Sequence, residues 1–80
     1  MRKMTNGTTT ITVTAHIILK NFWEYYVTDD KWTDDIVRCL VLGAEDEIGD
    51  VSLDEIAPYK LCQTENLGEV APAPGWSWVK

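Results

Sequence analysis

The feature that most constrains the fold is the stretch of residues 37–56, in which two strands and a helix start follow one another closely. The run Ile36–Leu42 is almost wholly apolar, which is typical of a strand inside a sheet. Gly43 opens a short acidic turn, and residues 48–51 return as a second strand. Strands joined by so short a connection pair antiparallel, so this stretch predicts a β-hairpin.

A capping box follows the hairpin and predicts one helical turn over residues 53–57. The Ser52 hydroxyl can accept a hydrogen bond from the Glu55 amide while the Glu55 carboxylate reaches back to Ser52. Pro58 cannot continue a helix, so we expect the helical turn to end there.

Residues 8–19 supply a further strand, because apolar and polar residues alternate there with a period of two. The alternate residues Ile11, Val13, Ala15, Ile17 and Leu19 are predicted to share one face, and a row of Thr residues shares the other face with His16 and Ile18. We interpret His16 as an ordinary surface or half-buried residue, since no carboxylate or nucleophile can be placed beside it. Residues 22–28 alternate in the same way and predict a second hairpin.

The remaining segments predict shorter elements. Residues 59–64 are typical of a short strand, residues 65–69 of a helical turn, and residues 76–80 of an edge strand. We therefore expect an α+β, mostly β fold with a small antiparallel sheet of about four or five strands and one or two short helical turns. Residues 1–7 are expected to form a flexible N-terminus, and residues 8–80 a single compact domain.

The charge of the chain is unevenly distributed. The formal net charge is −6, but residues 21–59 contain eleven acidic and two basic residues, a net charge of −9. Phosphate backbones are bound by Lys and Arg, so direct binding to nucleic acid is not expected. An acidic face suits a basic partner protein instead.

The cysteine usage and the hydropathy pattern indicate a protein of the cytoplasm. No signal peptide is recognisable, and no apolar run is long enough for a membrane span. We expect Cys39 and Cys62 to be reduced and to act as small buried hydrophobic residues. No membrane partner is expected.

The sequence contains no motif for catalysis, phosphate binding or zinc binding. The carboxylates lie in stretches typical of exposed loops, and the aspartates near position 32 lack the spacing of a calcium-binding EF-hand. We expect no enzyme activity, no cofactor and no metal site. A small hydrolase or sugar-binding module is an alternative that rests only on the acids and the Trp residues.

Residues 22–56 also resemble a known group of proteins. An aromatic strand, an acidic gap and the pattern Leu-Val-x-Gly-x-Glu-x-Glu-x-Gly-x-x-Ser-Leu-x-Glu are similar to small uncharacterised proteins of bacterial phages, plasmids and mobile elements. The positions that carry the resemblance are Gly43, Glu45, Glu47, Gly49, Ser52, Leu53 and Glu55. The resemblance implies a β-rich fold and a mobile-element origin, but it transfers no activity and no functional residue. In size and charge the chain resembles anti-CRISPR proteins.

These observations predict a small acidic protein of a phage or mobile element that binds and inhibits a host nucleic-acid-handling protein. The carboxylates would occupy the basic nucleic-acid-binding surface of that partner. The alternative is a structural or assembly accessory protein that acts as a homo-oligomer through an exposed strand edge. Whether the chain forms a homodimer is left open.

The predicted binding residues lie in two acidic segments. Folding alone explains the strands, the glycines and the cap, but it leaves the acidic turn after Gly43 and the Asp-rich loop around Trp32 unexplained. Trp is a favoured anchor at protein interfaces. We expect the two segments to lie beside each other, and the predicted binding residues are Trp32, Asp34, Asp35, Glu45, Asp46 and Glu47.

Overall fold

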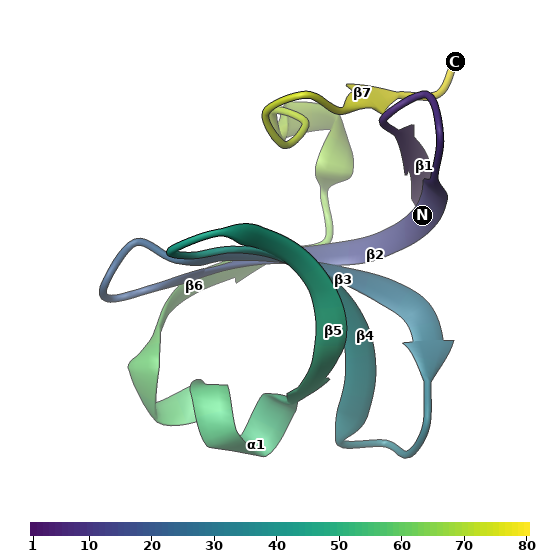
Figure 1. Ribbon diagram of the computed structural model, residues 1–80. Helices are drawn as coiled ribbons and strands as arrows, with labels where there is room; N and C mark the ends of the chain where they lie inside the picture. Colours follow the sequence, from purple (N-terminus) through teal and green to yellow (C-terminus); the bar gives the residue numbers. More distant parts are fainter.

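The computed structural model describes the whole chain from Met1 to Lys80 and shows a mostly β protein (Figure 1). Its seven strands belong to one antiparallel sheet. The strands are β1 (Arg2–Thr5), β2 (Thr10–Leu19), β3 (Glu24–Lys31), β4 (Ile36–Leu42), β5 (Asp46–Ser52), β6 (Lys60–Thr64) and β7 (Ser77–Trp78). The helical elements are the helix α1 (Leu53–Ile56) and the 3₁₀ turns η1 (Ala57–Tyr59) and η2 (Leu67–Glu69). The predicted α+β, mostly β class is confirmed.

The sheet has more strands than the sequence predicted because both ends of the chain join it. Residues 2–5, expected to be flexible, form β1 and pair with β2 and β7. The physical reason is Met4, which is fully buried although it stands in a polar and basic segment. Burial of one large apolar side chain stabilises a strand that four residues could not maintain alone.

Strand β2 connects the parts of the sheet. One of its edges pairs with β3, and the other pairs with β1 near the start of the strand and with β6 near its end. The register against β3 shifts between Val13 and Ala15. Such a shift changes the face that the following side chains occupy. The sequence predicted one apolar face for all of β2, but the bulge divides these residues between two faces.

A hydrophobic core therefore lies on each face of the sheet. The first core faces α1 and is formed by Ala15, Ile17, Leu19, Tyr25, Val27, Val37, Cys39 and Val41, with Leu53 and Ile56 packed against it. The second core is formed by Met4, Val13, Tyr26, Leu40, Leu67 and Ala73, with Trp76 and Trp78 packed against it. Neighbouring residues of β3 and β4 alternate between the two cores, as the pleat of a strand requires.

Two hydrogen bonds hold the C-terminal segment over the second core. The Tyr26 hydroxyl donates to the Ala71 carbonyl at 2.8 Å, and the Trp78 indole N–H donates to the Val70 carbonyl at 2.8 Å. The Arg2 guanidinium also lies over the Trp78 ring, 4.6 Å from its centroid. The predicted edge strand at the C-terminus is present as β7, which pairs with β1.

Tyr26→Phe tests this anchoring. The substitution keeps the ring but removes the donor to Ala71, so we expect the free energy of unfolding to fall by about 1 kcal/mol in urea denaturation. Tyr59→Phe is the control, because the Tyr59 ring is 61% exposed and its hydroxyl makes no hydrogen bond in the chain. Equal stability of the two variants would contradict the anchoring role.

Candidate functional site

The six predicted binding residues lie at opposite ends of the β3–β4–β5 meander (Figure 1). Residues 32–35 connect β3 to β4, and residues 43–45 connect β4 to β5. The whole of β4 separates these connections, a distance of about 20 Å at the rise of a strand. The expectation that the two acidic segments lie beside each other is therefore wrong. We refer to the end with residues 43–45 as the turn end and to the end with residues 32–35 as the loop end.

At the loop end, Asp35 has a structural role. Its carboxylate accepts hydrogen bonds from the Ser52 hydroxyl and from the Asp54 amide, both at 2.7 Å. These bonds, with the Ser52 hydroxyl as the largest cause, lower the pKa of the Asp35 carboxyl. Ser52 in turn accepts from the Glu55 amide at 3.3 Å, so the predicted N-cap of α1 is confirmed. The other half of the predicted capping box is absent, because the Glu55 carboxylate makes no hydrogen bond back to Ser52. Asp35 thus joins the loop to the helix start and is not free for a partner.

The other two loop-end residues of the predicted set are accessible. Trp32 is 70% exposed, and its backbone N–H donates to the Ile36 carbonyl while its side chain makes no hydrogen bond. Asp34 is exposed and lies with Lys31 at the rim of a cavity between the sheet and α1. No ion pair joins Asp34 to Lys31 or to any other basic residue.

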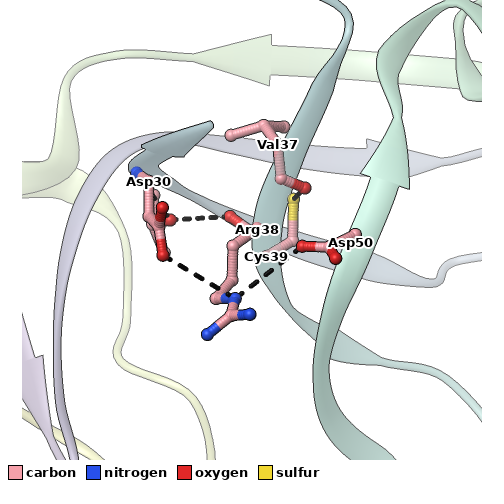
Figure 2. Close-up of polar contacts among 6 residues, drawn as sticks. Asp30, Val37, Arg38, Cys39 and Asp50 are labelled. Atoms are coloured by element: carbon pink, nitrogen blue, oxygen red, sulfur yellow. Dashed lines mark hydrogen bonds and ion pairs between the residues drawn. The ribbon is translucent and has the colours of Figure 1, made fainter. Parts of the chain in front are cut away.

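Further acids near the loop end have a basic neighbour in Arg38. Figure 2 shows this side chain between Asp30 of β3 and Asp50 of β5, with its Nε atom 3.8 Å and 3.7 Å from their carboxylate oxygens. Exposed ion pairs of this kind contribute little to stability. They do reduce the negative charge that a partner would meet on this part of the sheet.

The two cysteines are unpaired and differ in exposure. Cys39 is fully buried, its thiol lies 3.8 Å from the Val37 carbonyl (Figure 2), and burial raises the pKa of the thiol to about 12. Cys62 is exposed on β6, contrary to the prediction that both cysteines are buried. Residue type alone indicated burial, but β6 packs no side chain deeply.

At the turn end, Glu45, Asp46 and Glu47 are all exposed. No hydrogen bond or ion pair within the chain engages their side chains. Their strand register gives them different directions, because Asp46 is paired with Leu42 and Glu47 with Val41. Adjacent residues of a strand point to opposite faces. Glu47 therefore shares a face with the first core, and Asp46 shares the opposite face.

The turn of residues 20–23 lies beside the acidic turn (Figure 1). A side chain at Gly43 would meet the Trp23 ring, since a Cβ atom there would lie only 2.7 Å from ring carbons. Glycine thus permits the indole to lie directly on the backbone of the acidic turn. The neighbouring residue Phe22 is 76% exposed and has a φ of 69°, a left-handed conformation that is unusual for a large residue.

An open groove with aromatic walls occupies the same end of the sheet. Its volume is about 600 Å³, and its lining residues are Leu19, Lys20, Asn21, Trp23, Tyr25, Glu55, Ile56 and Tyr59. Trp23 is 39% exposed and Tyr59 is 61% exposed, whereas Tyr25 is buried and its pKa is raised by that burial. We refer to this feature as the turn-end groove. The sequence showed the aromatic residues but gave no sign that Tyr59 lies near Trp23.

A second cavity, of about 400 Å³, lies between the first core and α1. Its floor is apolar, and its rim carries three carboxylates and two lysines: Asp29, Asp34, Glu65, Lys31 and Lys60. The structure contains no buried side-chain nitrogen or oxygen without a hydrogen-bond partner. The opposite charges on this rim largely offset each other, whereas the turn-end groove lies beside three exposed carboxylates that have no partner within the chain, so we take the turn-end groove as the candidate site.

His16 has a carboxylate neighbour that the sequence could not place. It is 7% exposed, its Nε2 atom lies 2.9 Å from a Glu24 carboxylate oxygen, and its ring centroid lies 4.7 Å from that of Tyr26. No hydroxyl or thiol is hydrogen-bonded to the imidazole. The pair therefore has the geometry of a packed polar contact and supplies no nucleophile.

Two further features bear on ligands and membranes. No group of three or more His, Cys, Asp or Glu side chains is arranged to hold a metal ion. The one α-helix has four residues, and no helix is long and apolar enough to cross a membrane.

Comparison with known proteins adds no further identification. No protein-family model, no curated protein and no solved structure matches the chain. The resemblance to mobile-element proteins therefore stays a prediction.

Asp35→Asn tests the structural role of this carboxylate through the pH dependence of stability. The pKa of Asp35 is lowered in the folded state, so the ionised carboxylate stabilises the fold. This stabilisation is fully present above the unfolded-state pKa of about 4. It is lost as pH falls through the lower folded-state pKa. We expect the variant to unfold at lower urea concentration than the wild type at neutral pH, with the difference shrinking as pH falls below the unfolded-state pKa and through the lower folded-state pKa. Asp34→Asn, in the same loop, should follow the wild type throughout. Identical curves for the two variants would count against the Asp35 network.

Gly43→Ala tests the contact that joins the two turns. The added methyl group would displace the Trp23 ring, so we expect the free energy of unfolding to fall by about 1–2 kcal/mol and the Trp23 indole resonance to move in NMR spectra. Gly49→Ala is a matched control, because a Cβ atom there would meet nothing within 4 Å. Equal stability of the two variants would show that Trp23 does not rest on Gly43.

Proposed function

We propose that the protein binds a partner protein with a basic surface through the turn-end groove and the acidic turn. The observation that carries this proposal is the juxtaposition of three exposed carboxylates, none of them engaged within the chain, with an open groove walled by aromatic rings. The loop end offers less, because Asp35 is hydrogen-bonded within the fold and Arg38 lies between Asp30 and Asp50.

Lys and Arg are the side chains that such a surface suits. A cation over the face of Trp23 or Tyr59 would gain about 0.5–2 kcal/mol. Glu55 lines the groove, and Glu47 lies on the same face of the sheet, so carboxylates are available for a charge inserted between the rings. The remaining acidic residues would increase the rate of association with a basic surface more than they would increase the affinity.

Inhibition follows from the chemistry of the partner surface. Lys and Arg that bind phosphates are the same side chains that the carboxylates and aromatic rings of the turn end would engage. Binding of this protein and binding of nucleic acid would then exclude each other. A host nucleic-acid-handling protein, inhibited in the manner of an anti-CRISPR or other anti-defence protein, is the partner that we propose.

A pair of matched charge reversals tests the proposal. Glu45→Lys/Glu47→Lys changes the turn end, and Asp29→Lys/Asp34→Lys changes the loop end by the same charge. With each protein immobilised in host lysate, the wild type and the loop-end variant should capture a nucleic-acid-binding protein that is released by added DNA or RNA and by salt. The turn-end variant should lose at least tenfold in affinity for that protein.

The melting temperatures of both variants should match the wild type, because all four residues are exposed. Capture of no nucleic-acid-binding protein, or equal capture by the two variants, would overturn the proposal.

A further inference from the structure

Strand β5 lies at one end of the strand order and pairs only with β4. It has seven residues, contains no proline, and keeps a single register against β4 along its whole length. Proteins commonly protect such an edge with charged side chains, and every charged side chain of β5 is acidic. Carboxylates on a strand edge repel another acidic strand, but they attract a basic one.

Hydrogen bonds at the two ends of the β4–β5 ladder show which backbone groups of β5 are free. At one end the Leu53 amide donates to the Asp35 carbonyl at 3.0 Å. At the other end the Gly43 amide donates to the Glu45 carbonyl at 3.4 Å. Both bonds fit the register that joins the two strands. Because hydrogen-bonded and non-hydrogen-bonded pairs alternate in an antiparallel ladder, the odd-numbered residues of β5 are the ones bonded to β4.

The N–H and C=O groups of the even-numbered residues therefore point away from β4, toward the free edge. Within the strand these residues are Asp46, Ile48 and Asp50, followed by Ser52 at its end. Outside the β4–β5 ladder, no backbone hydrogen bond engages the first three. Their side chains share one face of the sheet, where Ile48 is 39% exposed and lies between the two aspartates. The edge thus offers free backbone groups together with an acidic–apolar–acidic pattern of side chains.

We propose that an extended basic segment of the partner adds to the sheet as a strand antiparallel to β5. This arrangement rests on the proposed function, because the segment belongs to the basic partner. Antiparallel pairing lets each outward-pointing residue of β5 exchange two hydrogen bonds with one residue of the segment. The main chain supplies affinity in such complexes, and the alternating side chains supply specificity.

The side chains of β5 define the sequence pattern of the segment. Lys or Arg is expected opposite Asp46 and Asp50, and an apolar residue is expected opposite Ile48. A further Lys or Arg lies opposite Glu47, on the other face of the sheet. The C-terminal end of the segment then lies beside the acidic turn, so one partner can occupy both the edge and the turn end.

Charge selects a basic segment over the other occupants of this edge. A second copy would place one acidic strand against another, and chains with a net charge of −6 repel each other. A neutral strand would leave the carboxylates of Asp46 and Glu47 without a partner. Asp50 has a cation on the β4 side, the Arg38 Nε atom at 3.7 Å, but its side chain is 42% exposed and can accept a second one.

The capped peptide Val-Lys-Thr-Val-Lys-Lys places a cation opposite Asp50, Glu47 and Asp46 and tests strand addition. The N–H groups of its second and fourth residues would point at β5, and those of its third and fifth residues would point to solvent. Methylation of the second and fourth nitrogens removes two hydrogen bonds to the sheet, whereas methylation of the third and fifth removes none. The two methylated peptides have the same mass and charge. In NMR titrations we expect the first to bind at least about tenfold more weakly than the second.

Hydrogen exchange identifies the edge that the unmodified peptide occupies. Exchange of the Ile48 and Asp50 amides should slow on binding, because both gain an acceptor. The Gly49 and Val51 amides already face β4 and should change little. Equal affinity of the two methylated peptides, or unchanged exchange at Ile48 and Asp50, would overturn strand addition.

The same titrations separate this inference from the proposed function. Equal binding of the methylated peptides with saturating shifts of the Trp23 indole would overturn strand addition alone. Absence of shifts both along β5 and at the Trp23 indole would overturn the proposed function as well.

Discussion

The register shift between Val13 and Ala15 is the local constraint on which the rest of the structure depends. It places the Val13 side chain in the core under the C-terminal segment. The side chains of Ala15, Ile17 and Leu19 lie in the core under α1. With regular pairing, the whole apolar face of β2 would point to one side. The C-terminal segment and β1 would then have no apolar surface from this strand to cover. A small sheet covered on both faces is how a chain of 80 residues obtains a sufficient core.

The same sheet separates the acidic residues into two groups with different roles. At the loop end three carboxylates have partners within the fold, since Asp35 accepts hydrogen bonds from the start of α1 and Arg38 lies between Asp30 and Asp50, while Asp34 is exposed without such a partner. At the turn end they have no internal partner. The contact of Trp23 with Gly43 holds two turns side by side there, and it orients an aromatic wall next to the unused charge. The negative charge of the sequence is thus partly structural and partly available.

The elements that depend on local chemistry could be predicted from the sequence. Strand Ile36–Leu42 was predicted with its bounds, because a run that is apolar except for Arg38 ends at a glycine. The Ser52 cap was predicted because its hydrogen bond joins residues three apart. The predictions that were wrong concern residues whose structure depends on long-range pairing. Burial of Met4 requires β2 and the C-terminal segment, and the bulge in β2 has no marker such as glycine.

The candidate site, too, could be predicted from the sequence only in part. The six acidic and aromatic residues could be selected from composition, but their arrangement depends on topology, since successive turns of a meander lie at opposite ends. Tyr59 joins Trp23 only because β6 returns along β2. The partner of His16 is likewise set by the β2–β3 pairing, which brings Glu24 within hydrogen-bonding distance.

The central claim is that the turn end is the binding surface. The most direct measurement is amide and indole chemical-shift mapping by NMR during titration with a short peptide rich in Lys and Arg. We expect the Trp23 indole and the amides of residues 20–25, 43–47 and 55–59 to shift together and saturate, with the Trp32 indole unchanged. Shifts centred on Trp32 and residues 33–35, with the Trp23 indole unchanged, would contradict it.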